Sequence, residues 1–189
     1  MKTVAVQDLD LASFQTFGSF SNLIDPKSFG FGKPPVEFYR DIIQQDLGGS
    51  ATASYAICRV EARPLVITSA EFHNQTCEGI LPLDNDVLIH VGPGTSPHGP
   101  VPVDDFQVYR VPKGTMVILR PGVWHHAPYT ANGQPANVLI VLPERTYVND
   151  CIAVRIEEER QLEITGVWSS QTVSARNQAP HAGSVGAHP

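Results

Sequence analysis

The sequence lacks any apolar run long enough to cross a membrane as a helix, since no stretch approaches ~18 consecutive apolar residues. Residues 1–10 contain acidic side chains where a signal peptide needs an apolar run. We therefore predict a cytoplasmic protein with no membrane partner.

Cysteine is also scarce. The chain has three cysteines, Cys58, Cys77 and Cys151, and no CxxC pair. An odd number without pairing excludes a disulfide framework and a zinc knuckle, and it favours buried reduced thiols.

Charge is low for a chain of 189 residues. Charged residues make up 17% of the chain, below the roughly one quarter that is typical of globular proteins. Thirteen Lys and Arg against 19 Asp and Glu give a net charge of −6. A chain without excess positive charge has no general attraction to phosphate backbones, so a nucleic-acid partner is not expected.

The sequence is rich in turn formers instead, with 15 glycines and 16 prolines. Together with the low charge, this composition favours a β protein over a helical bundle. From residue 52 onward, short apolar segments alternate with turn clusters and no helical pattern intervenes. The predicted strands cover 53–60, 64–70, 78–83, 86–91, 106–111, 115–120, 136–142 and 152–156. Such a series predicts an all-β fold, either a β-barrel or a double-sheet jelly roll.

The N-terminal part follows a different pattern. Apolar Leu11, Phe14 and Phe17 recur every third residue, which predicts a short amphipathic helix over residues 8–18 that ends at Gly18.

Two further segments precede the predicted strands. Residues 19–36 contain three prolines and are predicted to be a loop that could fold over the body as a lid. Residues 37–47 are predicted to be either a helical turn or an edge strand.

The C-terminal residues 169–189 consist mainly of Ser, Ala, Gly, His, Asn and Gln, a composition that cannot bury a core. We therefore predict a single domain over 1–168 and a disordered tail over 169–189.

The side chains that could do chemistry fall into two clusters. Glu71 and His73 lie two residues apart, so both point to one face of a strand, and Glu78 can return to that face after a bend. The adjacent His125 and His126 point to opposite faces of a strand, so at most one of them joins the first cluster. His90 ends an apolar strand, where a hydrogen-bonded core histidine is favoured over a ligand.

These clusters resemble the two metal-binding motifs of the cupin superfamily. Glu71-x-His73-x4-Glu78 matches the first motif, HxH followed by three or four residues and Glu, with Glu in place of the first His. His125 lies eleven residues after Gly114, as in the second motif. The resemblance implies a cupin-type β-barrel, or double-stranded β-helix, behind a short N-terminal helix. It also implies a site for a divalent ion such as Ni, Mn, Fe, Co or Zn, with Glu71, His73, Glu78 and His125 as ligands. The alternative is a polar cluster that binds no metal.

A closer resemblance covers roughly residues 2–157. Residues 123–128, VWHHAP, resemble the VWHHP signature of ureidoglycolate lyases, a cupin family of allantoin breakdown. The likeness extends to further positions of the family pattern: Phe14, Gly18, Pro82 and the run Asn149-Asp150-Cys151. Glu78 stands where the family often has Gln, and this adds a negative charge to the site.

The resemblance implies a metal-assisted lyase that splits ureidoglycolate, a small carboxylate, into glyoxylate and urea. Glu71, or His126 if it turns toward the pocket, is the candidate for proton transfer. Arg120 or Lys113 could pair with the substrate carboxylate, although Arg120 could equally be a solvated turn residue. Because cupins of this size often pair their sheets, the resemblance also implies a homodimer. Two alternatives stay open: an isomerase, epimerase or dehydratase that acts on another oxygen-rich metabolite, and a non-catalytic cupin that binds a small ligand.

Overall fold

The computed structural model describes residues 1–96 and 99–166, and the predicted tail over 169–189 lies outside these residues. The strands are β1 (Lys2–Asp8), β2 (Gly18–Asn22), β3 (Gly30–Lys33), β4 (Val36–Tyr39), β5 (Ala53–Val60), β6 (Val66–Ile67), β7 (Ser69–Phe72), β8 (Glu78–Pro82), β9 (Val87–Val91), β10 (Gln107–Val111), β11 (Thr115–Leu119), β12 (Tyr129–Thr130), β13 (Ala136–Pro143), β14 (Ile152–Arg155) and β15 (Leu162–Thr165). Within this described part, the α-helices are the four-residue α1 (Leu11–Phe14) and α2 (Thr146–Asn149). No helix there is long and apolar enough to span a membrane.

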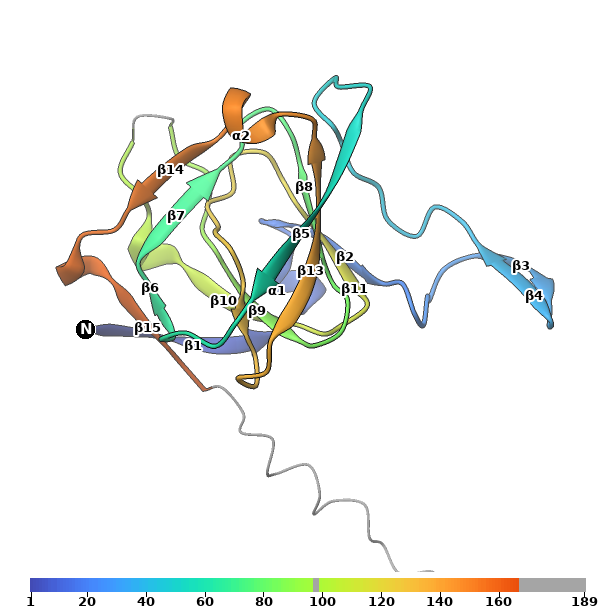
Figure 1. Ribbon diagram of the computed structural model, residues 1–189, viewed down its shortest axis with the longest axis horizontal. Helices are drawn as coiled ribbons and strands as arrows, with labels where there is room; N and C mark the ends of the chain where they lie inside the picture. The colour runs from blue at the N-terminus through green and yellow to red at the C-terminus, as the bar shows by residue number, and fades with distance from the viewer. Residues whose placement is uncertain (97–98, 167–189) are drawn as a thin grey trace, which may run out of the picture.

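Two larger sheets curl around a common interior (Figure 1). One has the strand order β12-β9-β10-β1-β15-β6 and the other the order β2-β11-β8-β13-β5. Two two-stranded sheets, β14-β7 and β3-β4, complete the arrangement. The all-β prediction is confirmed, and each of the eight predicted strand segments contains a strand.

Alternation along the strands builds two apolar cores. On β9, Val87, Ile89 and Val91 belong to the core between the two larger sheets, while Leu88 points to the opposite side and joins the second core. The second core fills the space between the six-stranded sheet and the β14-β7 pair. A strand that is apolar on both faces is typical of a buried strand, which explains the unbroken apolar run of β9.

The prediction of a helix over residues 8–18 was wrong in its extent. α1 begins after Asp10, whose carboxylate accepts hydrogen bonds from the backbone N–H groups of Ala12 and Ser13, and it spans only four residues. Gly18 does not cap the helix: it begins β2, where the backbone of Ile118 lies so close that a Cβ atom would collide with it. Close strand packing therefore explains this glycine.

The loop predicted over residues 19–36 was also wrong. Residues 18–22 form β2, and β3 and β4 form a hairpin that extends away from the barrel and does not close over it (Figure 1). Of the two predictions for residues 37–47, the strand is confirmed as far as Tyr39, where β4 ends.

Candidate metal centre

Two segments that are far apart in the sequence meet near one end of the barrel. Glu71 on β7 pairs with His125 in an antiparallel bridge, and each backbone N–H donates to the carbonyl oxygen of the other residue, at 2.6 and 2.8 Å. Directly opposed residues of an antiparallel pair point to the same side. The bridge therefore sets the Glu71 carboxylate beside the His125 imidazole.

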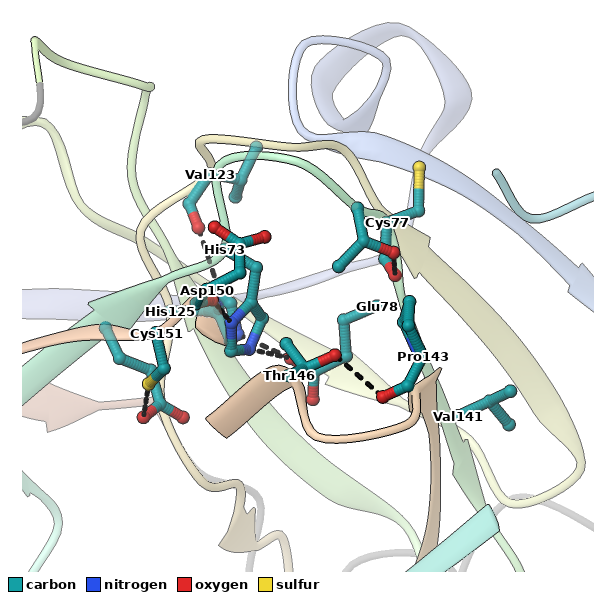
Figure 2. Close-up of polar contacts among 12 residues, drawn as sticks. His73, Cys77, Glu78, Val123, His125, Val141, Pro143, Thr146, Asp150 and Cys151 are labelled. Atoms are coloured by element: carbon teal, nitrogen blue, oxygen red, sulfur yellow. Dashed lines mark hydrogen bonds and ion pairs between the residues drawn. The ribbon is translucent and has the colours of Figure 1, made fainter. Parts of the chain in front are cut away.

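Glu78, the first residue of β8, points to the same place from the five-stranded sheet and is buried. Its Oε2 atom lies 2.7 Å from Nε2 of His125 and 3.1 Å from Nε2 of His73. Figure 2 shows Glu78 beside the two histidine rings. One ligand atom each from Glu71, His73 and His125 lie within 4.8 Å of one another. The structure thus brings together the four side chains predicted as ligands.

Backbone carbonyl groups hold both imidazole rings. Nδ1 of His73 lies 2.6 Å from the carbonyl oxygen of Asp150, and Nδ1 of His125 lies 2.8 Å from that of Val123. A carbonyl oxygen can only accept, so each Nδ1 carries a proton and donates it. When either ring is neutral, its Nε2 atom carries a lone pair on the side of the Glu78 carboxylate.

Asp150 and Cys151 make hydrogen bonds that stabilise the positions of His73 and Glu71. The two carboxylate oxygens of Asp150 accept hydrogen bonds from the backbone N–H groups of Asn74 and Gln75, at 2.9 and 2.8 Å. This fixes the turn that follows His73. The Cys151 thiol donates to Oε2 of Glu71 at a sulfur–oxygen distance of 3.6 Å. One short segment therefore positions both His73 and Glu71.

The charges of the centre are strongly coupled. Burial alone would raise the pKa of the Glu78 carboxyl, but the charge and hydrogen bond of His125, together with the nearby ring of His73, outweigh it and hold that pKa at about 2. Burial alone would lower the pKa of His125, but the Glu78 carboxylate outweighs it and raises that pKa. Glu78 is therefore ionised at neutral pH and favours a positive charge next to it.

The donor set fits a divalent cation. Nε2 of His73 is buried and makes no hydrogen bond, because its 3.1 Å contact with Glu78 lacks hydrogen-bond alignment. Two imidazole lone pairs and two carboxylates that face one point repel each other unless a proton or a cation lies between them. Histidines that bind metal through one nitrogen and donate the other N–H to a carbonyl group are the usual pattern of protein metal sites. Imidazole with carboxylate suits Mn, Fe, Co, Ni or Zn.

His126, the candidate for proton transfer, lies next to this centre and is partly buried. Burial lowers its pKa. The negative charge of Glu71 opposes this effect, and the positive charges of His125 and Arg63 reinforce it. His126 is therefore neutral at pH 7. His126 follows the bridge residue His125 in the chain and lies outside the strands.

The two predicted cationic side chains are not brought to the centre. Arg120 is exposed and lines a surface cavity of ≈ 390 Å³ with Gln45 and Cys77, on the face of β8 opposite to Glu78. Lys113 is exposed in the turn before β11, at the end of that strand remote from Leu119, which pairs with Glu78.

Sequence reasoning gave no role to three side chains near the centre. The Tyr147 ring on α2 lies 6.0 Å from the His73 ring, and burial together with the charges of Glu78 and Glu71 raises the pKa of its phenol. Burial, followed by the Glu71 charge, raises the pKa of the Cys151 thiol to about 11. Cys58 on β5 also feels the charges of Glu78 and Glu71, and burial raises its pKa. The run Asn149-Asp150-Cys151 was a signal for this region, but only its fold placed it there.

A model of the ureidoglycolate lyase family matches residues 1–163 of the chain. The comparison of the chain with curated proteins found no match.

Several solved structures share a distant similarity. An oxalate decarboxylase of Bacillus subtilis, a protein with Mn(II) centres, is 14% identical with a TM-score of 0.39, over 56% of this chain and 24% of that one. A dTDP sugar isomerase from Desulfovibrio desulfuricans G20 is 10% identical with a TM-score of 0.46, over 76% of this chain and 87% of that one. The formate complex of Lactobacillus farciminis oxalate decarboxylase is 12% identical with a TM-score of 0.41, over 65% of this chain and 37% of that one. The chain thus spans about a quarter of the length of the Bacillus subtilis protein.

Proposed function

Since the chain belongs to the ureidoglycolate lyase family, we propose that it is a metal-assisted lyase that cleaves the C–N bond of ureidoglycolate, or of a related small hydroxy acid. The products from ureidoglycolate are glyoxylate and urea. The observation that carries the metal assistance is the convergence of Glu71, Glu78 and the Nε2 atoms of His73 and His125 on one buried point.

The reaction is an elimination and needs no oxidant or reductant. The hydroxyl group of the substrate loses its proton, and the electron pair of that O–H bond forms the carbonyl bond of glyoxylate. The C–N bond breaks at the same carbon, and the nitrogen leaves as urea after it takes up a proton. One group that removes a proton and one that returns it are therefore sufficient.

Glu71 is the side chain best suited to move the proton. It is the least buried of the four converging residues, so a substrate can reach it. Its Oε2 atom accepts the hydrogen bond of Cys151, and the thiol keeps its own proton at neutral pH because its pKa is raised to about 11. We assign to Glu71 both the removal of the hydroxyl proton and its return to the leaving nitrogen.

Glu78 and the two histidines would hold a divalent cation together with Glu71. When bound, such a cation supplies positive charge for the carboxylate and hydroxyl oxygens of the substrate and for the negative charge that develops as the C–N bond breaks. Since Arg120 and Lys113 do not face the centre, the substrate carboxylate depends on this charge.

The test is glyoxylate release from ureidoglycolate by the full chain, prepared metal-free and then loaded with Mn, Fe, Co, Ni or Zn in turn. We expect release that requires metal, is lost on chelation and returns on reloading. As a control for metal loading, the His126→Ala variant should bind the same amount of metal, because its neighbour His125 carries the ligand atom. A wild-type chain that binds metal stoichiometrically but releases no glyoxylate would refute the substrate and leave a different cupin reaction or ligand binding.

A further inference from the structure

Arg63 lies on the link between β5 and β6, which leads from one larger sheet to the other. β5 is an edge strand of the five-stranded sheet, and β6 is an edge strand of the six-stranded sheet. The Cζ atom of Arg63 lies over the ring of Tyr129, 4.1 Å from its centroid, and Nη2 of Arg63 donates to the carbonyl oxygen of Ala127 at 2.8 Å. An aromatic face and a backbone carbonyl group therefore fix the position of this cation.

The support below the guanidinium group is itself fixed. Tyr129 is buried on β12, and its phenol group donates to the carbonyl oxygen of Val66 at 2.8 Å. The ring of Tyr129 thus cannot turn without breaking a hydrogen bond. Arg63 is exposed to solvent on its other side. Its position is therefore set before any ligand arrives, which reduces the entropy that a ligand must pay for on binding.

The hydrogen bond to Ala127 also places Arg63 near the candidate metal centre. Ala127 lies two residues after His125, whose Nε2 atom faces Glu78. Two side chains from different parts of the fold, His126 and Cys58, feel both Arg63 and the centre. Burial is the main influence on the pKa of each of them, and both pKa values also respond to the positive charge of Arg63 and to the negative charges of the centre. Arg63 is thus within electrostatic reach of the same groups as the centre.

Much of the hydrogen-bonding capacity of Arg63 is still available. A guanidinium group has five N–H donors in a planar fork, and Ala127 and Tyr129 engage only part of them. Arg110 and Arg145 lie 3.0 and 3.4 Å from a carboxylate oxygen, whereas no acidic side chain of the described residues forms an ion pair with Arg63. A positioned cation with spare donors, close to a reaction centre, is suited to bind a ligand.

We infer that Arg63 is a specificity-determining residue that binds the ureido group of the substrate. The inference rests on the proposed function, in which the carboxylate and hydroxyl oxygens of the substrate take the positive charge at the centre. The ureido group then extends away from the centre along the C–N bond that breaks. Its carbonyl oxygen is an acceptor with two lone pairs, which the planar donors of a guanidinium group match. Arg63 therefore selects a hydroxy acid with a ureido substituent over a simple hydroxy acid.

The same contact assists the departure of urea. When the C–N bond breaks, its electron pair stays on the nitrogen and is shared with the ureido oxygen. A cation that is already in place stabilises this negative charge without reorganisation. Arg63 keeps its own protons, because arginine is not deprotonated in proteins. The proton that the leaving nitrogen takes up still comes from Glu71.

Calorimetric titration of the metal-loaded full chain with two stable probes tests the inference. N-carbamoylglycine has a carboxylate and a ureido group, whereas glycolate has a carboxylate and a hydroxyl group. We expect Arg63→Ala to weaken the binding of N-carbamoylglycine by about 10–100-fold, the size of a hydrogen bond to a charged group. The binding of glycolate should not change. Arg120→Ala, which removes another exposed arginine, is the matched control and should bind both probes as the wild type does.

Chemical rescue separates binding of the ureido group from a structural role of Arg63. Arg63→Ala should lower kcat/KM for ureidoglycolate by about 10–100-fold as well, since the contact persists while the C–N bond breaks. Added guanidinium ion, at concentrations that leave the melting temperature unchanged, should restore part of this loss in Arg63→Ala and have no such effect on the wild type. A purely structural role would lower the melting temperature and would give no rescue.

The outcomes distinguish this inference from the proposed function. If the wild type releases glyoxylate but Arg63→Ala binds N-carbamoylglycine equally well, the inference is overturned and the proposed function stands. Equal weakening for both probes would also overturn it, because Arg63 would then act on the part that the probes share. If the wild type releases no glyoxylate but binds N-carbamoylglycine in a manner that depends on Arg63, the reaction is refuted and the ureido contact is supported.

Discussion

His90 and the pair His73 and His125 are almost equally inaccessible, with exposed fractions of 1%, 2% and 3%, yet they have opposite surroundings. His90 lies on β9 in an apolar setting, with the ring of Phe106 at 5.3 Å and that of Tyr129 at 6.3 Å. Neither of its ring nitrogens makes a well-formed hydrogen bond within the described residues. The rings at the centre each donate through Nδ1 and face a carboxylate through Nε2.

The difference teaches that burial alone does not make a histidine a ligand. Burial lowers the pKa of His90 to about 3, and the positive charges of His125, His126 and Arg63 act in the same direction. Burial acts in the same direction on His125, but the Glu78 carboxylate reverses its effect and raises the pKa. His90 is thus a core histidine, as predicted, although the predicted hydrogen bond is missing.

The largest expected effect comes from removal of a ligand at the centre. His73→Ala and His125→Ala should each lower metal affinity more than about 100-fold, since loss of a supporting group alone costs 10–100-fold. Each should also abolish turnover. Metal content after gel filtration measures this, and His90→Ala and His126→Ala should both keep the metal. Full metal retention in His125→Ala would contradict the ligand assignment.

Asp150→Ala should have a smaller effect, about 10–100-fold in metal affinity. The substitution keeps the backbone carbonyl that holds His73 but frees the turn at Asn74 and Gln75. A metal titration of the metal-free variant measures the change, with Asn149→Ala, at the preceding residue, as the control. An unchanged affinity would show that the carbonyl group alone positions the ring.

The lowered pKa of His90 should make the free energy of unfolding depend on pH. Its folded pKa of about 3 lies below its ordinary value of 6.5. Between these values the unfolded chain binds a proton that the folded chain does not, so the free energy of unfolding falls as pH decreases, by about 1.4 kcal/mol per pH unit. His90→Leu should remove this one-proton slope in urea unfolding between pH 6 and 4. Above pH 7 the difference in the free energy of unfolding between the two proteins should be constant. Equal slopes at acidic pH would contradict the buried neutral ring.

His125 contributes to the free energy of unfolding with the opposite sign, because its raised pKa gives stability that is lost as pH rises through that pKa.

The smallest effect concerns the cationic side chains outside the centre. Arg120→Ala and Lys113→Ala should change the KM for ureidoglycolate by no more than about twofold, the usual size of a surface substitution. Steady-state kinetics measures this. A tenfold increase for either variant would mean that it contacts the substrate after all.

Much of the barrel could be predicted because strands with period-two patterning and turn clusters between them carry their own signal. The eight predicted segments, which contain the nine strands β5 to β11, β13 and β14, follow this rule. The short strands β2, β3, β12 and β15 were missed, since two to five residues carry little pattern, and β4 was predicted only as one of two alternatives. β1 was missed because no pattern marked residues 2–8 as a strand, and its partners β10 and β15 lie more than 100 residues away in the sequence.

Local spacing in the sequence already limits which residues can meet: the two-residue spacing of Glu71 and His73 puts them on one face, and His125 lies eleven residues after Gly114. The tertiary structure alone decided that they do meet, because sheet register sets the pairing of Glu71 with His125 and the approach of Glu78. It also decided that the carbonyl group of Asp150, 77 residues from His73, turns that ring toward the centre. Spacing along a strand is a local property of the backbone, whereas register and ring orientation depend on hydrogen bonds between segments that only the folded chain brings together.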